Sequence, residues 1–188
     1  MAKSTLTDAQ KVLLTETADL HHKAEEHPFG AAMSAGELSP QEWADWMAAM
    51  LQIYLAVDPM LPVSGRRSHD LFMDLLKMKN AGVSPVQSVE ALAVANRITL
   101  NPTDIDYVGG VSYILLGANL RGGQLIRKAL TAKGVDACSH LFFVEEDKAD
   151  GEVHLDALRS SKGVVNGARE MFTSIVAIMD EIWSRYRS

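Results

Sequence analysis

The chain has 188 residues, of which 18 are Lys or Arg and 24 are Asp or Glu, so its formal net charge is −6. Its composition, 47% apolar and 22% charged, is that of a globular protein rather than a disordered chain. The acidic balance disfavours a general nucleic-acid-binding protein, and the single cysteine, Cys138, excludes an intramolecular disulfide, a zinc ribbon or an iron–sulfur cluster.

Helical periodicity predicts helices over residues 7–27, 40–59, 68–80, 85–98, 103–130, 136–147 and 154–186, the last of them broken near Gly163. Alternating runs bounded by hairpin turns are absent from the sequence, and no linker or repeat divides it. We therefore expect an all-α protein with a single domain over residues 1–188.

Start and stop signals support these predicted boundaries. Ser39, Pro40 and Glu42 have the spacing of a capping box, in which the serine and glutamate side chains bond reciprocally to the backbone. Similar starts are expected at Ser84-Pro85 and at Thr103 with Asp106, and the predicted helix ends are at Gly36, Gly82, Gly134 and Gly151.

The first predicted helix carries a histidine on its apolar face. His21 lies in register with Leu14, Ala18 and Ala24, while Glu25 follows one turn later, where its carboxylate can orient the imidazole. An oriented, neutral imidazole on an apolar surface is what an axial haem ligand requires. An ordinary core or capping histidine fits the same spacing, so the helix pattern alone leaves both interpretations open.

The segment 113–124, YILLGANLRGGQ, interrupts a strongly helical stretch with Gly117, Gly122 and Gly123. Each interior glycine costs a helix about 0.5–1 kcal/mol relative to alanine, so three together need a reason. Close approach of the backbone to a flat ligand is one reason. A simple break between helices, or close helix–helix packing, is the other.

Taken together, these motifs resemble those of the haem oxygenase family. The segment 20–25, LHHKAE, matches that family's first-helix pattern, Leu/Val-His-x-x-Ala-Glu, and is followed by Phe29 and Gly36. The segment 113–124 matches its glycine-rich distal helix, and Gly167–Phe172 matches a Gly-Ala-x-x-x-Phe helix near its C-terminus. The matches occur in the family's order over about residues 13–185.

The resemblance implies that haem, O2 and electrons from a donor protein or reductase yield biliverdin, CO and ferrous iron. It implies His21 as the axial iron ligand, Glu25 as its partner, and Tyr113 as a further haem contact. It also implies that the catalytic distal surface consists of Gly117, Asn119, Gly122 and Gly123. Asn119 stands where animal-type members have an Asp, and an amide cannot ionise.

Haem propionates require cations at the mouth of the pocket. By position we expect Lys11 and Lys148 there, with Arg159 and Lys162 as further candidates, although exposed solubilising charges explain any single one of them. Two alternatives to a haem oxygenase stay open: a haem-binding or haem-sensing relative without turnover, and another enzyme on a related all-α fold, such as a di-iron oxidase.

We expect a cytoplasmic protein with no membrane partner. The N-terminal segment lacks the apolar core of a signal peptide, and the sequence nowhere contains about 18 consecutive apolar residues.

Overall fold

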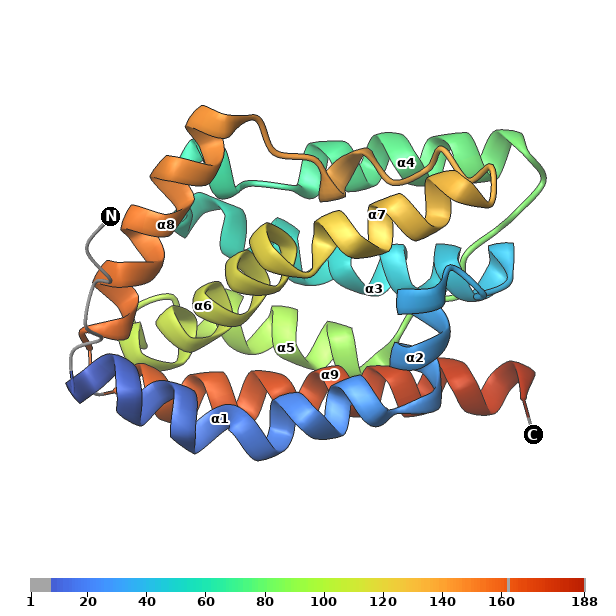
Figure 1. Cartoon of the computed structure of the whole chain (residues 1–188). Helices are drawn as coiled ribbons and strands as arrows, with labels where there is room; N and C mark the ends of the chain where they lie inside the picture. The colour runs from blue at the N-terminus through green and yellow to red at the C-terminus, as the bar shows by residue number, and fades with distance from the viewer. Residues whose placement is uncertain (1–7, 162, 188) are drawn as a thin grey trace.

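The computed structural model describes residues 8–161 and 163–187, and within this part helices joined by short loops form the whole fold, with no strand (Figure 1). The all-α prediction is confirmed. The helices are α1 (Asp8–Glu26), α2 (Pro28–Ala35), α3 (Pro40–Val57), α4 (Ser68–Asn80), α5 (Val89–Leu100), α6 (Ile105–Arg121), α7 (Gly123–Ala132), α8 (Glu145–Arg159) and α9 (Val164–Tyr186). Short 3-10 turns lie at η1 (Asp58–Met60), η2 (Val63–Gly65) and η3 (Ser139–Leu141).

Local capping explains the boundaries that were predicted correctly. Ser39 and Glu42 form the expected capping box: the Glu42 amide donates to Ser39 Oγ at 3.3 Å, and the Ser39 amide donates to Glu42 Oε2 at 2.7 Å. Gly36, Gly82 and Gly134 have φ values of +67°, +83° and +80° just beyond helix ends, a left-handed conformation that favours glycine.

Two predicted signals were wrong for reasons visible in the packing. Gly151 does not end a helix; it lies inside α8, where a Cβ would stand 2.7 Å from Leu120 Cδ1, so its role is close packing. The helix start predicted at Ser84-Pro85 is four residues too early, since α5 begins at Val89. Its N-cap is Ser88, whose hydroxyl accepts a hydrogen bond from the Ala91 amide at 3.1 Å.

The predicted helix over residues 136–147 is wrong. Residues 136–144 contain η3 and no α-helix, and only the last three residues of the predicted range are helical, because α8 begins at Glu145. The polar groups of residues 136–144 bond to other helices: the His140 amide donates to Asp74 of α4 at 3.1 Å, and Trp43 Nε1 of α3 donates to the Ala137 carbonyl at 2.8 Å.

The predicted helix over 103–130 divides at Gly122 into α6 and α7, and the predicted break near Gly163 separates α8 from α9. The short α2 was not predicted.

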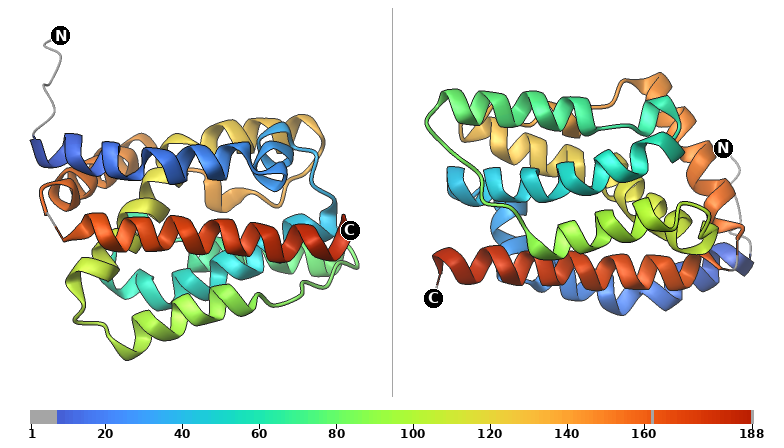
Figure 2. Two further views of the ribbon diagram at one scale, coloured as in Figure 1. Left: turned by 90° about the horizontal axis from the view of Figure 1, so that it is seen from below. Right: turned by 180° about the vertical axis from the view of Figure 1, so that it is seen from behind.

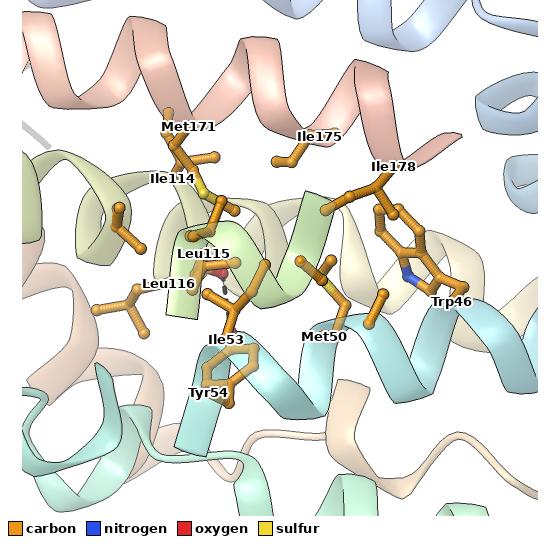
Figure 3. Packing of buried hydrophobic residues seen from close by; sticks show 14 of the residues in the cluster. Trp46, Met50, Ile53, Tyr54, Ile114, Leu115, Leu116, Met171, Ile175 and Ile178 are labelled. Atoms are coloured by element: carbon orange, nitrogen blue, oxygen red, sulfur yellow. Dashed lines mark hydrogen bonds between the residues drawn. The ribbon is translucent and has the colours of Figure 1, made fainter. Parts of the chain in front are cut away.

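Glycines let α6 lie against α9 at backbone distance. A Cβ on Gly110 would stand 2.2 Å from the Ala168 amide nitrogen, and one on Gly167 would stand 2.5 Å from the Asp106 carbonyl oxygen. Side chains of α3, α6 and α9, among them Ile53, Leu115 and Met171, pack together beside this crossing (Figure 3). The crossing therefore fixes the position of α6, whose other surface is left to line a cavity.

Helix α1 runs alongside α9, on the outside of this core (Figures 1 and 2). The contact between them leaves part of the inward face of α1 without a packed neighbour, as described below. No helix in the described part of the chain combines the length and the apolar character needed to cross a membrane.

Candidate haem-binding cavity

A cavity of about 620 Å³ lies between α1, α2, α3, α6, α7, η3 and α9. This volume is within the range of pockets that bind small molecules and cofactors. Most of the lining is apolar. Its Trp, Tyr and Phe side chains come from three helices: Trp43, Trp46 and Tyr54 of α3, Tyr113 of α6 and Phe172 of α9. Its imidazoles are His21 and His22 of α1 and His140 of η3.

The predicted apolar face of α1 forms one wall. Leu14, Ala18, His21 and Ala24 all line the cavity, as their common register requires. The side chain of His21 is nevertheless 58% exposed, because the space in front of it is open. The interpretation of His21 as an ordinary buried core histidine is therefore wrong.

The α1 histidines differ in which ring nitrogen they leave available. His21 Nδ1 lies 3.5 Å from Glu25 Oε2, so the predicted carboxylate partner is on the correct side and Nε2 stays available. The His21 ring packs edge-on against Phe172, with centroids 5.6 Å apart. His22 also lines the cavity, but its Nε2 is paired with Glu26 at 3.0 Å. His27 caps α2 through Nδ1 and meets Asp180 through Nε2.

Helix α6 contributes Tyr113, Gly117, Asn119 and Gly122 to another wall. A Cβ on Gly117 would have only one neighbour within 4 Å, Leu155 Cδ2 at 3.9 Å, so protein packing does not demand glycine at this position. Gly123 is different: it is buried against Leu141, outside the lining, where a Cβ would stand 3.4 Å from Leu141 Cδ2. Three of the four predicted distal residues therefore lie together, and Gly123 packs behind them.

Asn119 is held by a buried tyrosine of α3. Asn119 Nδ2 donates to the Tyr54 hydroxyl at 2.6 Å, and that hydroxyl donates to the Leu115 carbonyl at 3.3 Å. Burial raises the pKa of Tyr54 well above its ordinary value, so the phenol stays protonated. Asn119 can therefore offer the cavity Oδ1 as an acceptor and the second Nδ2 hydrogen as a donor.

Of the predicted cations, Lys11, Lys148 and Arg159 do not line the cavity. Lys11 pairs with Asp8 at 3.2 Å and Lys148 with Glu145 at 2.6 Å, and Lys162 lies outside the described residues. Arg159 is buried beside α6, with its guanidinium carbon 5.6 Å from the centre of the Tyr113 ring.

Among the described lysines and arginines, only Arg121 lines the cavity, and its guanidinium donates a hydrogen bond to Glu152 at 3.0 Å. The sequence placed Arg121 in the glycine segment without assigning it a role.

Sequence reasoning missed the pairing of His140 with Asp74. Asp136 stands four residues before His140 in the sequence, but the structure places Asp74 Oδ2 2.8 Å from His140 Nδ1. The two residues are 66 positions apart in the sequence, so no local sequence pattern predicts their contact.

Comparison with solved structures shows that the chain has the haem oxygenase fold. Haem oxygenase-1 from the cyanobacterium Synechocystis sp. PCC6803, in complex with haem, superimposes with a TM-score of 0.80 at 16% identity, over 95% of this chain and 94% of that one. Haem oxygenase from Leptospira interrogans gives 0.77 at 18% identity, over 93% of this chain and 100% of that one. Haem oxygenase-2 from Synechocystis, in complex with haem and NO, gives 0.75 at 17% identity, over 96% of this chain and 88% of that one.

No protein-family model matches the sequence, and no curated protein does. Similarity at 16–18% identity shows the fold and leaves activity to be argued from the residues of the site.

Proposed function

We propose that this protein binds haem in the cavity between α1 and α6 and cleaves it oxidatively to biliverdin, CO and ferrous iron. The observation that carries the proposal is the placement of His21, backed by Glu25, in the same cavity as the glycine-bearing surface of α6. The solved structures of the same fold include two haem complexes, which supports haem as the ligand.

His21 suits an iron whose other ligands come from a porphyrin. It offers one imidazole nitrogen, Nε2, while Glu25 lies beside Nδ1 and favours the tautomer protonated there. Haem then supplies the redox chemistry through its iron, and the protein supplies the axial ligand and the shape of the site. The proposal assigns iron ligation to His21 alone.

The surface at Gly117 suits a flat ligand. Gly117 lines the cavity, and a Cβ there would have Leu155 Cδ2 at 3.9 Å as its one protein neighbour within 4 Å, so the glycine lets a porphyrin face approach the backbone of α6. We assign Gly117, Asn119 and Gly122 to contacts with the haem face or with O2, and Tyr113 to contact with the haem edge. Gly123 supports this surface from behind.

Proton supply is assigned to Asn119 with ordered water. Tyr54 takes one of the two Nδ2 hydrogens, and Oδ1 of Asn119 can accept a hydrogen bond from a water molecule. Asn119 itself neither donates nor removes a proton, so its role is to hold that water. The reaction also needs O2 and an electron-donor protein or reductase, which we expect the protein to meet in the cytoplasm.

A haem-binding protein without turnover is the second candidate. Asn119 favours it, because no carboxyl group stands at the position where a catalytic water network needs a proton-conducting group. Both candidates require the same cavity and the same axial ligand.

Aerobic turnover separates the two candidates. The protein, loaded with one equivalent of haem, is given ascorbate or a reductase system in air, and its spectrum is followed. We expect the Soret band to decay while bilin absorbance grows. A Soret band that persists after the iron has been reduced would establish the non-catalytic alternative, and the His21→Ala variant provides the background rate.

A further inference from the structure

Arg121 is a cation at the cavity to which the proposed function gives no role. It is the last residue of α6, its side chain is 50% exposed, and it is the one lysine or arginine among the described residues that lines the cavity. Most of the exposed lining residues lie on α1, among them His21, or at this end of α6, so the cavity meets solvent at these two elements. Arg121 therefore lies at the mouth of the cavity.

Close packing of α6 against α8 fixes where the Arg121 side chain lies. Gly151 of α8 packs against Leu120, since a Cβ on this glycine would stand 2.7 Å from Leu120 Cδ1. This contact brings together the next residues of the two helices, Glu152 and Arg121. Arg121 Nη2 donates to Glu152 Oε2 at 3.0 Å and to Oε1 at 3.4 Å. The guanidinium is therefore tied to the cavity wall from the α8 side.

Hydrogen bonds to the described residues use one nitrogen of this guanidinium. Both bonds come from Nη2, so Nη1 and Nε have no acceptor within the described part of the chain. An arginine has five N–H donors in a planar fork, which lets it hold a second carboxylate beside the first. Glu152 also lies 3.9 Å from Nη1 of Arg159, a buried guanidinium, so it keeps a cationic neighbour when Arg121 binds a ligand.

Arg121 also lies on the face of α6 that the proposed haem site uses. Tyr113, Gly117 and Arg121 follow one another at four-residue intervals, and all three line the cavity. A flat ligand against Gly117 therefore has Tyr113 in one direction along the helix and Arg121 in the other, each about 6 Å away along the helix axis. Haem carries its two propionate groups on one edge, and a guanidinium at the mouth is placed to receive a carboxylate of that edge.

We propose that Arg121 binds a propionate carboxylate of the tetrapyrrole at the mouth of the cavity, and that Glu152 competes with this carboxylate for the guanidinium. The inference rests on the proposed function, since it assumes that a tetrapyrrole occupies the cavity. It adds a residue that selects a carboxylate-bearing ring edge and directs this edge toward the α8 side of the mouth. Because the two carboxylates carry like charges, each weakens the hold of Arg121 on the other.

The test compares protohaem with its dimethyl ester, in which both propionates are uncharged and the ring is the same. Each is titrated at pH 8 into the apoprotein, and the dissociation constants are read from the Soret band and from quenching of Trp43 and Trp46 fluorescence, since both indoles line the cavity. The measured quantity is the ester constant divided by the free-acid constant, in which changes of axial ligation cancel. We expect this ratio to exceed one in the wild-type protein and to fall as salt is added.

Two variants should change the ratio in opposite directions. Arg121→Gln removes the cation, and we expect the ratio to fall by about 3- to 10-fold, the size of a charge-assisted hydrogen bond at a half-exposed site. Glu152→Gln removes the competing charge and should raise the ratio by about 2- to 3-fold. Arg127→Gln of α7, outside the cavity lining, changes the net charge as Arg121→Gln does and should leave the ratio unchanged.

Loss of a purely structural ion pair would weaken binding of both porphyrins alike and leave the ratio at its wild-type value. That result in Arg121→Gln overturns the inference, and so does a ratio that does not rise in Glu152→Gln. Urea unfolding of each apo variant checks that it folds, and should Arg121→Gln not fold, Glu152→Gln carries the test alone. Failure of the wild-type protein to bind either porphyrin would instead overturn the proposed function, so the two failures are distinguishable.

Discussion

The side-chain amide of Asn119 on α6 donates to the buried hydroxyl of Tyr54 on α3 at 2.6 Å. This bond joins the two helices across the cavity wall and uses one of the two hydrogens of the amide nitrogen. Because the Tyr54 proton is directed to the Leu115 carbonyl, the phenol acts as acceptor toward Asn119. The bond therefore leaves Asn119 Oδ1 for a cavity water.

The Asn119→Ala variant tests that role. It removes Oδ1 without touching α1, so we expect haem affinity to stay within about threefold of wild type while the rate of haem cleavage falls by about tenfold or more, by loss of assisted proton delivery. Single-turnover decay of the Soret band measures the rate. An unchanged rate would remove Asn119 from the catalytic assignment, and Tyr54→Phe, which removes the acceptor of the Nδ2 hydrogen bond, is the companion variant.

Gly117 and Gly110 lie on one helix and should respond oppositely to alanine. Gly117→Ala adds a methyl group that meets only an ordinary contact, Leu155 Cδ2 at 3.9 Å, so the free energy of unfolding of the apoprotein should rise by about 0.5–1 kcal/mol through helix propensity. Gly110→Ala forces a Cβ against the backbone of α9 and should lower that free energy by about 1–3 kcal/mol. Urea unfolding of the two apo variants measures the difference.

The same Gly117→Ala variant should bind haem about tenfold more weakly, because its methyl group occupies the surface that the porphyrin face needs and overpacking costs about 1–3 kcal/mol. A variant that is more stable and binds haem normally would show that Gly117 does not contact the ligand.

Glu25→Gln tests the partner of the axial ligand. The Nδ1–Oε2 distance is 3.5 Å and both groups are exposed, so the carboxylate contributes less than a buried partner would. We expect haem affinity to fall by less than about tenfold, below the usual range for residues that orient a metal ligand. Glu26→Gln, which acts on His22, should have no effect. A loss of more than a hundredfold at Glu25 would mean that its contact with His21 tightens when haem binds.

Asp74 makes the apoprotein sensitive to acid. Its pKa is lowered in the folded protein, so its contribution to stability is complete above the unfolded value near 3.8 and is lost as pH falls through the lower, folded value. Asp74→Asn should be about 1–3 kcal/mol less stable at pH 7, and the difference from wild type should shrink below pH 3.8. Urea unfolding between pH 7 and pH 3 measures it, with the exposed Glu90→Gln as control. A difference that does not change with pH would contradict this account.

Features that depend on neighbouring residues were predictable from the sequence. The capping box at Ser39 and the left-handed stop at Gly36 involve residues within a few positions, and their chemistry does not depend on the rest of the fold. The register of Leu14, Ala18 and His21 likewise follows from helix geometry alone. What the register could not tell is whether that face meets a packed core or an open cavity.

Features that depend on distant residues were not predictable. The segment 136–147 has helical composition, but before α8 begins its backbone bonds to side chains of other helices. The His140 amide donates to Asp74 and the Ala137 carbonyl accepts from Trp43, and the predicted helix does not form there. The sequence did not indicate that Gly110 and Gly167 pack α6 against α9, because their partners lie elsewhere in the chain. Propionate-binding cations were expected at Lys11 and Lys148, whereas among the described lysines and arginines Arg121 is the one that lines the cavity.

Axial ligation by His21 is the central claim, and haem titration of three proteins tests it most directly. The wild-type protein and His22→Ala should each bind one equivalent of haem with the Soret band of an imidazole-ligated iron. His21→Ala should lose that band, and added imidazole should restore it. A His21→Ala protein with the wild-type Soret band, or a His22→Ala protein without it, would contradict the account.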